Sequence, residues 1–364
     1  MNTGVILPGA TSLLGLVFFL FLLDQYRVRR RTFQLVWAIG MLFYAIAAGA
    51  EAAAQVAGWT GPLFRAYYLA GAVWTVAWLG LGTAFLLART RFGYAFAGSL
   101  LLAGLFTFLA DRRYHYPGSG EAPLLYFVGA GVLALGVAAA TYLQDDRWPR
   151  IAAVAIGGTT VLSLLLMAVV QLPAPVYAAD TLTGIPDTAV LPGTIRLLTP
   201  FMNVTGAFSL LLGALFSAYV FMPKRRVLSY SLDPGQRGDE LLFNLIIAPV
   251  AIAVNFVASL PGAVRALLAG RLNSRVPATI IIAFGAFVPT VTDTLNRFGD
   301  ARFSQAGHLV AIVCIFAGFL VSIEVFAEIR IPFTGVVLRP TRRERADTTP
   351  ASAQGAADTG ATTS

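Results

Sequence analysis

Residues 27–58 read RVRRRTFQLVWAIGMLFYAIAAGAEAAAQVAG, in which a cluster of four arginines is followed by an apolar stretch long enough to cross a membrane. Basic residues that flank apolar spans stay on the cytoplasmic side of the membrane. The cluster therefore predicts that residues 5–23 run inward and residues 33–57 run outward. The N-terminus is expected to lie outside.

The composition is that of a membrane protein, with 57% hydrophobic residues, 12% charged residues and a mean hydropathy of +0.74. The net charge of +8 comes from short basic clusters between apolar runs, which is typical of orientation signals. We therefore expect an all-α polytopic transmembrane bundle that contacts the lipid bilayer and binds no nucleic acid. Lys224 is the only lysine. We attribute this bias to a high-GC bacterium and expect the protein in the bacterial cytoplasmic (inner) membrane.

Seven apolar segments alternate with basic or polar links over residues 1–222, and we assign this region to a seven-span helical bundle. Arginines mark the inner links, and prolines, glycines and aromatic residues mark the outer loops. The predicted spans are 5–23, 33–57, 66–88, 93–110, 124–143, 151–171 and 197–222.

Residues 241–260 are apolar enough for an eighth span, and the distribution of charge decides how they are interpreted. If they cross, there are ten spans and 14 of the 26 basic residues lie inside; if they enter and leave on the cytoplasmic side, 20 lie inside. The second arrangement fits the positive-inside rule better, and it makes Pro249 and Pro261 the break points of a hairpin.

We therefore expect about nine spans, with ten as the alternative. Residues 223–276 then form a cytoplasmic link plus a re-entrant or interfacial hydrophobic segment, and residues 277–332 contain two further spans, at 277–294 and 306–327. The tail, 333–364, is rich in alanine, threonine, glycine and serine, which predicts a disordered cytoplasmic segment.

Glu51 is the most informative polar residue, because an ionisable group in an apolar span is costly unless it is paired or faces a cavity. Tyr44, Glu51 and Gln55 lie on one stripe of the predicted helix. We expect Glu51 near the outer end of its span, where Arg65 could pair with it. In the alternative interpretation, these residues line an outward-facing polar pocket to which Arg196, Asp111 and the 172–196 loop contribute.

Small residues recur at every fourth position of the seventh span, at Thr205, Ser209, Gly213 and Ser217. Such a stripe lets helix backbones approach closely in lipid. The sequence favours packing within one bundle, and a homodimer interface stays open as the alternative.

Catalytic motifs are absent from the sequence. There is no Walker loop, glycine-rich dinucleotide turn, Gly-x-Ser-x-Gly elbow or His-Glu-x-x-His helix. One cysteine, Cys314, allows no internal disulfide or cysteine-based metal site, and the only histidines are His115 and His308. A metal or proton-sensing site shared by the two histidines is conceivable, but we expect no cofactor, no metal and no enzymatic activity.

The layout of residues 1–222, with an outer N-terminus, Trp37 at the start of the second span and Glu51 near its outer end, resembles the seven-span sensory region of some bacterial histidine kinases. The chain also resembles other bacterial multi-span proteins of unassigned activity. The resemblance to the kinases implies recognition of a small ligand or a membrane state from outside. No phospho-accepting histidine domain or ATP lid follows the seventh span, so a signal would pass to a separate cytoplasmic or membrane partner.

Two functions follow as expectations. The first is a non-enzymatic sensor or accessory subunit with an outward-facing polar pocket, which would contact its partner through the link Ser231 to Glu240 and the re-entrant segment. The alternative is a transporter or channel for a small solute, which an inverted repeat or broken helices near the midplane would favour.

Overall fold

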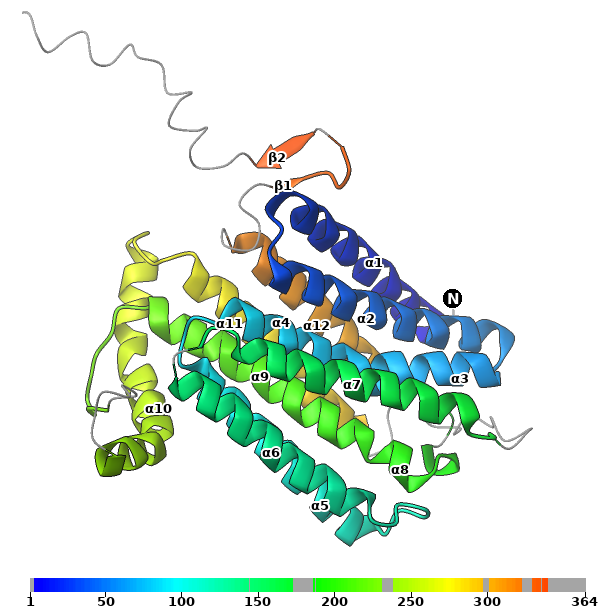
Figure 1. Ribbon diagram of the computed structural model, residues 1–364. Helices are drawn as coiled ribbons and strands as arrows, with labels where there is room; N and C mark the ends of the chain where they lie inside the picture. The colour runs from blue at the N-terminus through cyan, green and yellow to red at the C-terminus, as the bar shows by residue number, and fades with distance from the viewer. Residues whose placement is uncertain are drawn as a thin grey trace, which may run out of the picture.

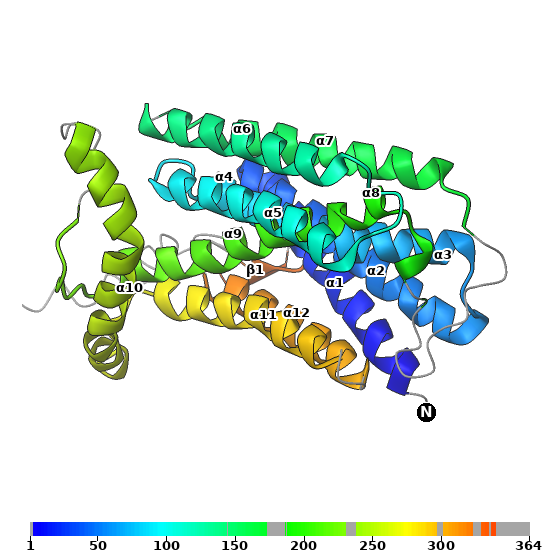
Figure 2. The ribbon, with the colours of Figure 1, turned by 90° about the horizontal axis from the view of Figure 1, so that it is seen from below.

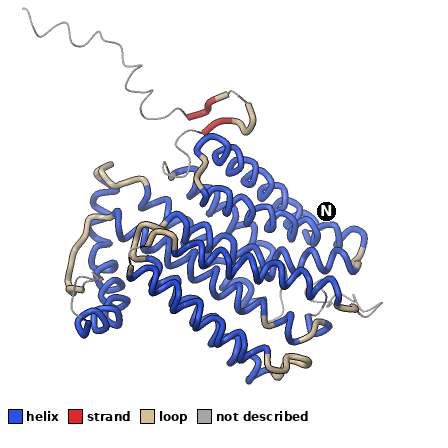
Figure 3. Tube along the Cα trace, viewed as in Figure 1, coloured by secondary structure: helices blue, strands red, loops and turns tan. Residues whose placement is uncertain are grey.

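A computed structural model of the protein describes residues 3–143, 145–172, 186, 188–230, 238–296, 301–322, 329–334 and 336–339. Long helices dominate this part of the chain and run side by side (Figures 1 and 3). The first half contains α1 (Thr3–Arg29), α2 (Thr32–Ala57), α3 (Gly61–Tyr67), η1 (Tyr68–Thr75), α4 (Val76–Leu86), α5 (Phe92–Tyr114), α6 (Ala122–Tyr142) and α7 (Trp148–Val169). The second half contains η2 (Thr188–Val190), α8 (Gly193–Arg196), α9 (Leu198–Phe221), α10 (Gly238–Leu268), α11 (Arg275–Asn296), α12 (Ala301–Val321), β1 (Ile329–Arg330) and β2 (Val337–Arg339).

Nine helices in the described ranges are long and apolar enough to cross a membrane. The prediction of a polytopic transmembrane helical bundle is confirmed. The nine include Ile246–Leu268 of α10, whereas the apolar part of α11, Arg275–Pro289, is shorter than the nine and is not among them. Length and composition therefore give the expected number of spans, but they select α10 in place of α11.

The third span is continuous but changes its helix type. It begins as α3, passes through the π-helix η1 and continues as α4. Within the π-helix the Thr75 hydroxyl donates to the carbonyl of Ala70, five residues earlier, at 2.7 Å. The indole N–H groups of Trp74 and Trp78 then donate to Ser163 and Thr160 of α7, which fastens α7 to the side of the bundle.

α9 lies inside the bundle and packs against α4, α5 and α11. Thr205, Ser209, Gly213 and Ser217 are all buried, and Ser209 exchanges a hydrogen bond with Ser99 of α5 at 3.1 Å. The stripe therefore serves packing within one copy of the chain, and its side chains are not available to a second copy.

The arrangement of α10 differs from that of its neighbours. It runs across the ends of the other helices in two perpendicular views (Figures 1 and 2). The end of α9 and the beginning of α11 meet at this side of the bundle, because the guanidinium carbon of Arg275 lies 4.2 Å from the ring centre of Phe221. Ala263 of α10 and Val276 of α11 share a buried cluster with Tyr219 and Met222.

The contact between the end of α9 and the beginning of α11 determines on which side of the bundle α10 lies. Because α9 ends and α11 begins at the same end of the bundle, the chain between them leaves and returns on one side. A single continuous helix such as α10 cannot cross the membrane between those two points. We therefore propose that the seven earlier spans, α11 and α12 make the nine crossings.

The predicted break points in α10 are wrong. Pro249 and Pro261 lie inside one helix of 31 residues. A proline in a helix removes a single backbone hydrogen bond and crowds the preceding turn. Both prolines are exposed, on the outer side of α10, where the helix can bend away from its own core contacts.

The predicted disordered tail begins too early. Val337–Arg339 form β2, which pairs antiparallel with β1. The turn between the strands is held to α1, because the backbone N–H of Phe333 donates to the Asp24 carboxylate at 3.2 Å and Arg27 lies over the Phe333 ring. Residues 340–364 lie outside the described part of the chain, as do residues 231–237 of the predicted partner-binding link.

The closest approach of two helices gives a test of this packing. A β-carbon added at Gly206 of α9 would lie 2.3 Å from the backbone of Val76, so α4 and α9 would have to separate. We expect Gly206→Ala to lower the free energy of unfolding by about 1–3 kcal/mol, the usual cost of overpacking. Reversible unfolding in mixed micelles measures this change.

Gly136→Ala is the matched control, because a β-carbon at this position of α6 would meet no atom within 4 Å. It should be neutral or gain up to about 1 kcal/mol from helix propensity. Equal destabilisation by the two substitutions would contradict the close approach of α4 and α9.

Candidate functional site

Glu51 lies between helices, where an ionisable side chain of a membrane span is away from lipid and can form hydrogen bonds. It is 5% exposed, and its carboxylate accepts a hydrogen bond of 2.7 Å from the side-chain amide of Gln305 in α12. Two helical turns further into the bundle, the Tyr44 hydroxyl donates to the backbone carbonyl of His308 at 2.7 Å. The polar stripe of α2 is therefore directed toward α12.

Arg65 has a different neighbour, so the expected ion pair with Glu51 is wrong. The Arg65 guanidinium donates to the carbonyl of Val170 at 2.7 Å, at the end of α7. α3 presents Arg65 toward α7, while α2 presents Glu51 toward α12. The arginine thus completes the hydrogen bonding at a helix C-terminus, where a cation is favoured.

The remaining outer residues form contacts of their own. The Arg196 guanidinium lies over the ring of Tyr116, 4.4 Å from its centre, and Tyr68 and Thr199 share a hydrogen bond of 2.7 Å. One carboxylate oxygen of Asp111 is buried without a hydrogen-bond partner in the described part of the chain.

These contacts distribute the predicted site residues among different neighbours. Tyr44 and Glu51 meet α12, Arg65 meets α7, and Arg196 meets the loop after α5. Gln55 is half-buried near the end of α2. A pocket that joins all of them stays a prediction, since residues 173–185 and 187 of the long outer loop lie outside the described ranges.

The two histidines, which could have shared a metal or proton-sensing site, lie on different elements and have different neighbours. His115 follows α5, whereas the His308 ring lies edge-on to Tyr44, with the ring centres 6.3 Å apart. Among the described residues, no group of three or more histidine, cysteine, aspartate and glutamate side chains could hold a metal ion.

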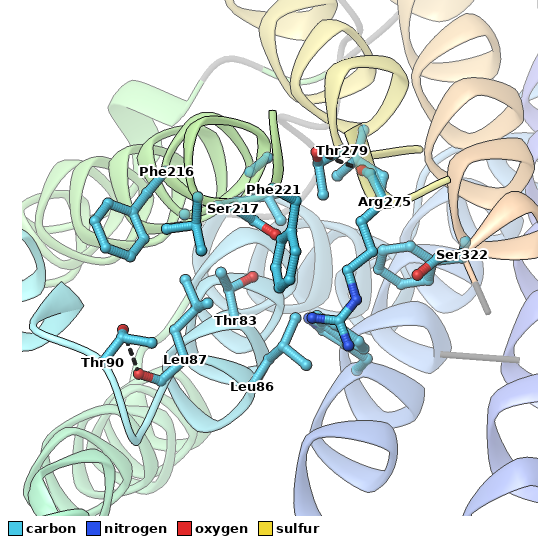
Figure 4. Close-up of a pocket in the computed structure, with 17 residues that line it drawn as sticks. Thr83, Leu86, Leu87, Thr90, Phe216, Ser217, Phe221, Arg275, Thr279 and Ser322 are labelled. Atoms are coloured by element: carbon cyan, nitrogen blue, oxygen red, sulfur yellow. Dashed lines mark hydrogen bonds between the residues drawn. The ribbon is translucent and has the colours of Figure 1, made fainter. Parts of the chain in front are cut away.

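A cavity of about 150 Å³ lies at the other end of the bundle (Figure 4). Trp37 of α2 lines this cavity. Because Trp37 precedes Glu51 by 14 residues, the cavity lies about 21 Å from Glu51 along the axis of α2. α4, α9, α11 and α12 supply the other walls. The lining residues are Trp37, Thr83, Leu86, Leu87, Thr90, Leu210, Gly213, Ala214, Phe216, Ser217, Val220, Phe221, Arg275, Thr279, Ile282, Phe319 and Ser322.

Among the described residues that line the cavity, Arg275 is the one with a cationic side chain. Figure 4 shows the Arg275 side chain extending from the start of α11 into the cavity, toward Leu86. Three of the lining hydroxyl groups donate to backbone carbonyls, Thr83 to Leu79, Thr90 to Leu87 and Thr279 to Arg275. Those three oxygens are left mainly as acceptors, and most of the remaining wall is apolar.

Arg275 was not predicted as a site residue from the sequence. In the sequence, Arg275 is one of the basic residues that indicate orientation, and Gly213 and Ser217 belong to the packing stripe. A signal was present, because Arg275 directly precedes an apolar helix and could have been expected at a membrane surface. What the sequence lacked was the pairing of α11 with α4 and α9.

Comparisons with known proteins find no matching family model, no similar curated protein and no similar solved structure.

The contact between Glu51 and Gln305 can be tested against the rejected ion pair by double-mutant cycles. We expect Glu51→Ala and Gln305→Leu each to cost about 1–2 kcal/mol of stability, with a coupling of about 0.5–1.5 kcal/mol, as for other hydrogen bonds between helices in lipid. Glu51→Ala and Arg65→Gln should add to within about 0.5 kcal/mol. Unfolding in mixed micelles measures both cycles. Additivity for the first pair together with coupling for the second would restore the ion pair.

Proposed function

We propose that this chain is a non-enzymatic bacterial inner-membrane protein, a sensor or accessory subunit, whose responsive element is α10 lying in the plane of the inner leaflet. The observation that carries the proposal is the placement of α10 across one end of the bundle. By the positive-inside rule this end is cytoplasmic, because the arginines after α1 and the basic run after α9 lie there.

The outer side of α10 is apolar and has no covering in the described structure. Ile246 is 73% exposed and Leu268 is 83% exposed, and the residues of the same face between them are valine, alanine and proline. An exposed apolar stripe along a whole helix marks a membrane or protein contact. We assign it to lipid of the inner leaflet.

The opposite side of α10 packs against the bundle, and two of its polar side chains fasten it to the chain after α9. The side chain of Asn255 is fully buried, and its oxygen accepts from the backbone N–H groups of Val227 and Leu228 at 2.7 and 2.9 Å. Its amide donates to the Leu228 carbonyl at 2.8 Å, and Ser259 accepts from the N–H of Arg225 at 2.9 Å. A helix that is hydrogen-bonded to the protein on one side and exposes an apolar side on the other is suited to a membrane surface.

The charges around α10 favour anionic lipid. Lys224, Arg225 and Arg226 precede it, and Arg265 and Arg271 lie at or just beyond its end. Basic residues next to the cytoplasmic leaflet each contribute about 1 kcal/mol of attraction to anionic lipids. The depth of α10 would therefore respond to the lipid composition, and a partner protein could detect that response.

The depth of α10 in vesicles tests this proposal. In a Cys314→Ala background, an environment-sensitive fluorophore is attached to a cysteine at Val257, on the apolar side, and the full chain is reconstituted. We expect quenching by lipids that carry a shallow quencher and little quenching by iodide in the water. Raising the anionic lipid content should increase the quenching by lipid.

A fluorophore at Arg226, before α10, serves as the control and should be quenched by iodide. Equal access of iodide to positions 226 and 257 would contradict the in-plane placement. If the depth of α10 does not change with lipid charge, the proposed sensor role is wrong and α10 is a fixed anchor.

A further inference from the structure

We infer that the cavity between α4, α9, α11 and α12 binds a small uncharged aromatic molecule that carries a hydroxyl group, a phenol. The site is separate from the apolar side of α10, and it does not depend on how α10 lies at the membrane. Three features of the cavity carry the inference: one buried hydroxyl group, aromatic walls and size. Each of them concerns residues that the structure describes.

The buried hydroxyl group is that of Ser217. The residue is 6% exposed and lines the cavity (Figure 4). Thr205 and Ser209, in the same stripe of α9, donate to the carbonyls four residues before them, at 2.9 and 2.6 Å. In the described part of the chain the Ser217 hydroxyl forms neither this bond nor any other. A buried hydroxyl is costly without a partner, so a molecule in the cavity is favoured if it hydrogen-bonds to Ser217.

Other hydroxyl groups on the wall complete the hydrogen bonding that a ligand can make. Thr83 and Thr279 already donate to backbone carbonyls, so their oxygens can only accept. Ser217 can donate or accept. A hydroxyl group on the ligand can therefore accept from Ser217 and donate to an acceptor on the wall, whereas a ligand without polar atoms leaves Ser217 unpaired.

The ligand needs no charge, because the cationic side chain on the described wall has neighbours of its own. The Arg275 guanidinium lies over the ring of Phe221, 4.2 Å from its centre, and the residue has a further interaction besides. A charged ligand would also lose its hydration against walls that are mainly apolar. These walls therefore favour an uncharged molecule.

Aromatic rings from three helices line the cavity. Trp37 of α2 and Phe319 of α12 lie with their ring centres 4.5 Å apart, and Phe216 and Phe221 of α9 add two more rings. The indole N–H of Trp37 donates to the carbonyl of Leu79 at 2.9 Å, which fixes the ring and leaves its apolar surface to a ligand. Aromatic pairs attract each other by more than their buried area gives, so these walls favour a ligand that is itself a ring.

The size of the cavity fits one ring. A volume of about 150 Å³ is comparable to the engineered apolar cavity that holds a benzene molecule, and a phenol has one oxygen atom more. Water is a poorer occupant, because each buried water molecule needs about two to four polar partners and most of this wall is apolar. The ring can belong to a free phenol or to a lipid that carries a phenol at its end, and the experiment separates them.

Fluorine NMR of para-fluorophenol, added to the purified full chain in neutral detergent, tests the site. At about pH 7 the probe is uncharged, because a phenol titrates near pH 10. Micelles without protein show how much of the signal comes from uptake by the detergent. We expect broadening that requires the protein and that unlabelled phenol reverses. Fluorobenzene, which lacks the hydroxyl, should bind more weakly, and para-fluorobenzoate, which is charged, should not bind.

Competition by two unlabelled phenols identifies the source of the ring. The compound para-methylphenol represents a free small molecule, and para-octylphenol represents a ring at the end of a lipid chain. Displacement of the probe by the first alone indicates a free phenol, and displacement by the second alone indicates a lipid. Displacement by both indicates a cavity that also opens toward the bilayer.

Variants connect the signal to Ser217. Ser217→Ala removes the hydroxyl and keeps the cavity, so it should weaken para-fluorophenol binding roughly two- to tenfold, the loss of one neutral hydrogen bond, and leave fluorobenzene binding unchanged. Ser217→Leu fills the cavity and should abolish the binding of both. Ser209→Ala is the matched control, because Ser209 is a buried serine of the same helix that does not line the cavity. It should bind like the parent.

Three results would overturn the inference: no broadening that requires the protein, binding of para-fluorobenzoate as tight as that of para-fluorophenol, or equal affinities of Ser217→Ala and Ser209→Ala for the probe. The first would leave water only as the occupant of the cavity. If Ser217→Leu does not fold, the two alanine variants decide, because each removes a single oxygen atom. Failure here leaves the depth of α10 unaffected, since the two measurements use different residues and different media.

Discussion

The close contact between α4 and α9 is the constraint on which the rest of the bundle depends. Gly80 and Gly206 bring two backbones together, and a β-carbon at Gly80 would lie 2.6 Å from the Gly206 carbonyl oxygen. Helices in lipid gain little from the hydrophobic effect and associate through close packing and hydrogen bonds. Further along α9, the same run of small residues also forms one wall of the cavity, which Gly213, Ala214 and Ser217 line. One sequence pattern thus accounts for both the packing and the cavity.

The position of α9 also determines what α10 can do. α11 packs against α9 and begins where α9 ends, so the connection between them stays on one side of the bundle. The 31 residues of α10 are long enough to cross a bilayer, yet the helix lies across the bundle instead. Its burial is completed by the chain that follows α9, through Asn255 and Ser259. This helix is held to the protein on one side and has apolar residues on the other, and we propose that it joins the bundle to the membrane surface.

Local sequence patterns predicted the spans of the first half of the chain. They did not predict side-chain contacts between residues that are distant in sequence. Apolar length and basic clusters are properties of a short stretch, so α1 to α9 were expected near their observed places. Pro249 and Pro261 were expected to break a helix, but both lie on its exposed side. Glu51 was assigned to Arg65 because the two are close in sequence, whereas its partner Gln305 is 254 residues away. Arg275 could not be recognised as a cavity residue until α11 was placed against α4 and α9.

The most direct measurement of this account is the side of the membrane on which the end of α10 lies. In a Cys314→Ala background, a cysteine at Arg271, which is exposed just beyond the end of α10, should react with a membrane-impermeant reagent only after the cells are opened. Glu121→Cys, after α5, should react in intact cells, and Val227→Cys, before α10, should not. Labelling of position 271 in intact cells would show that α10 crosses the membrane, and it would contradict both the nine-span arrangement and the in-plane placement of α10.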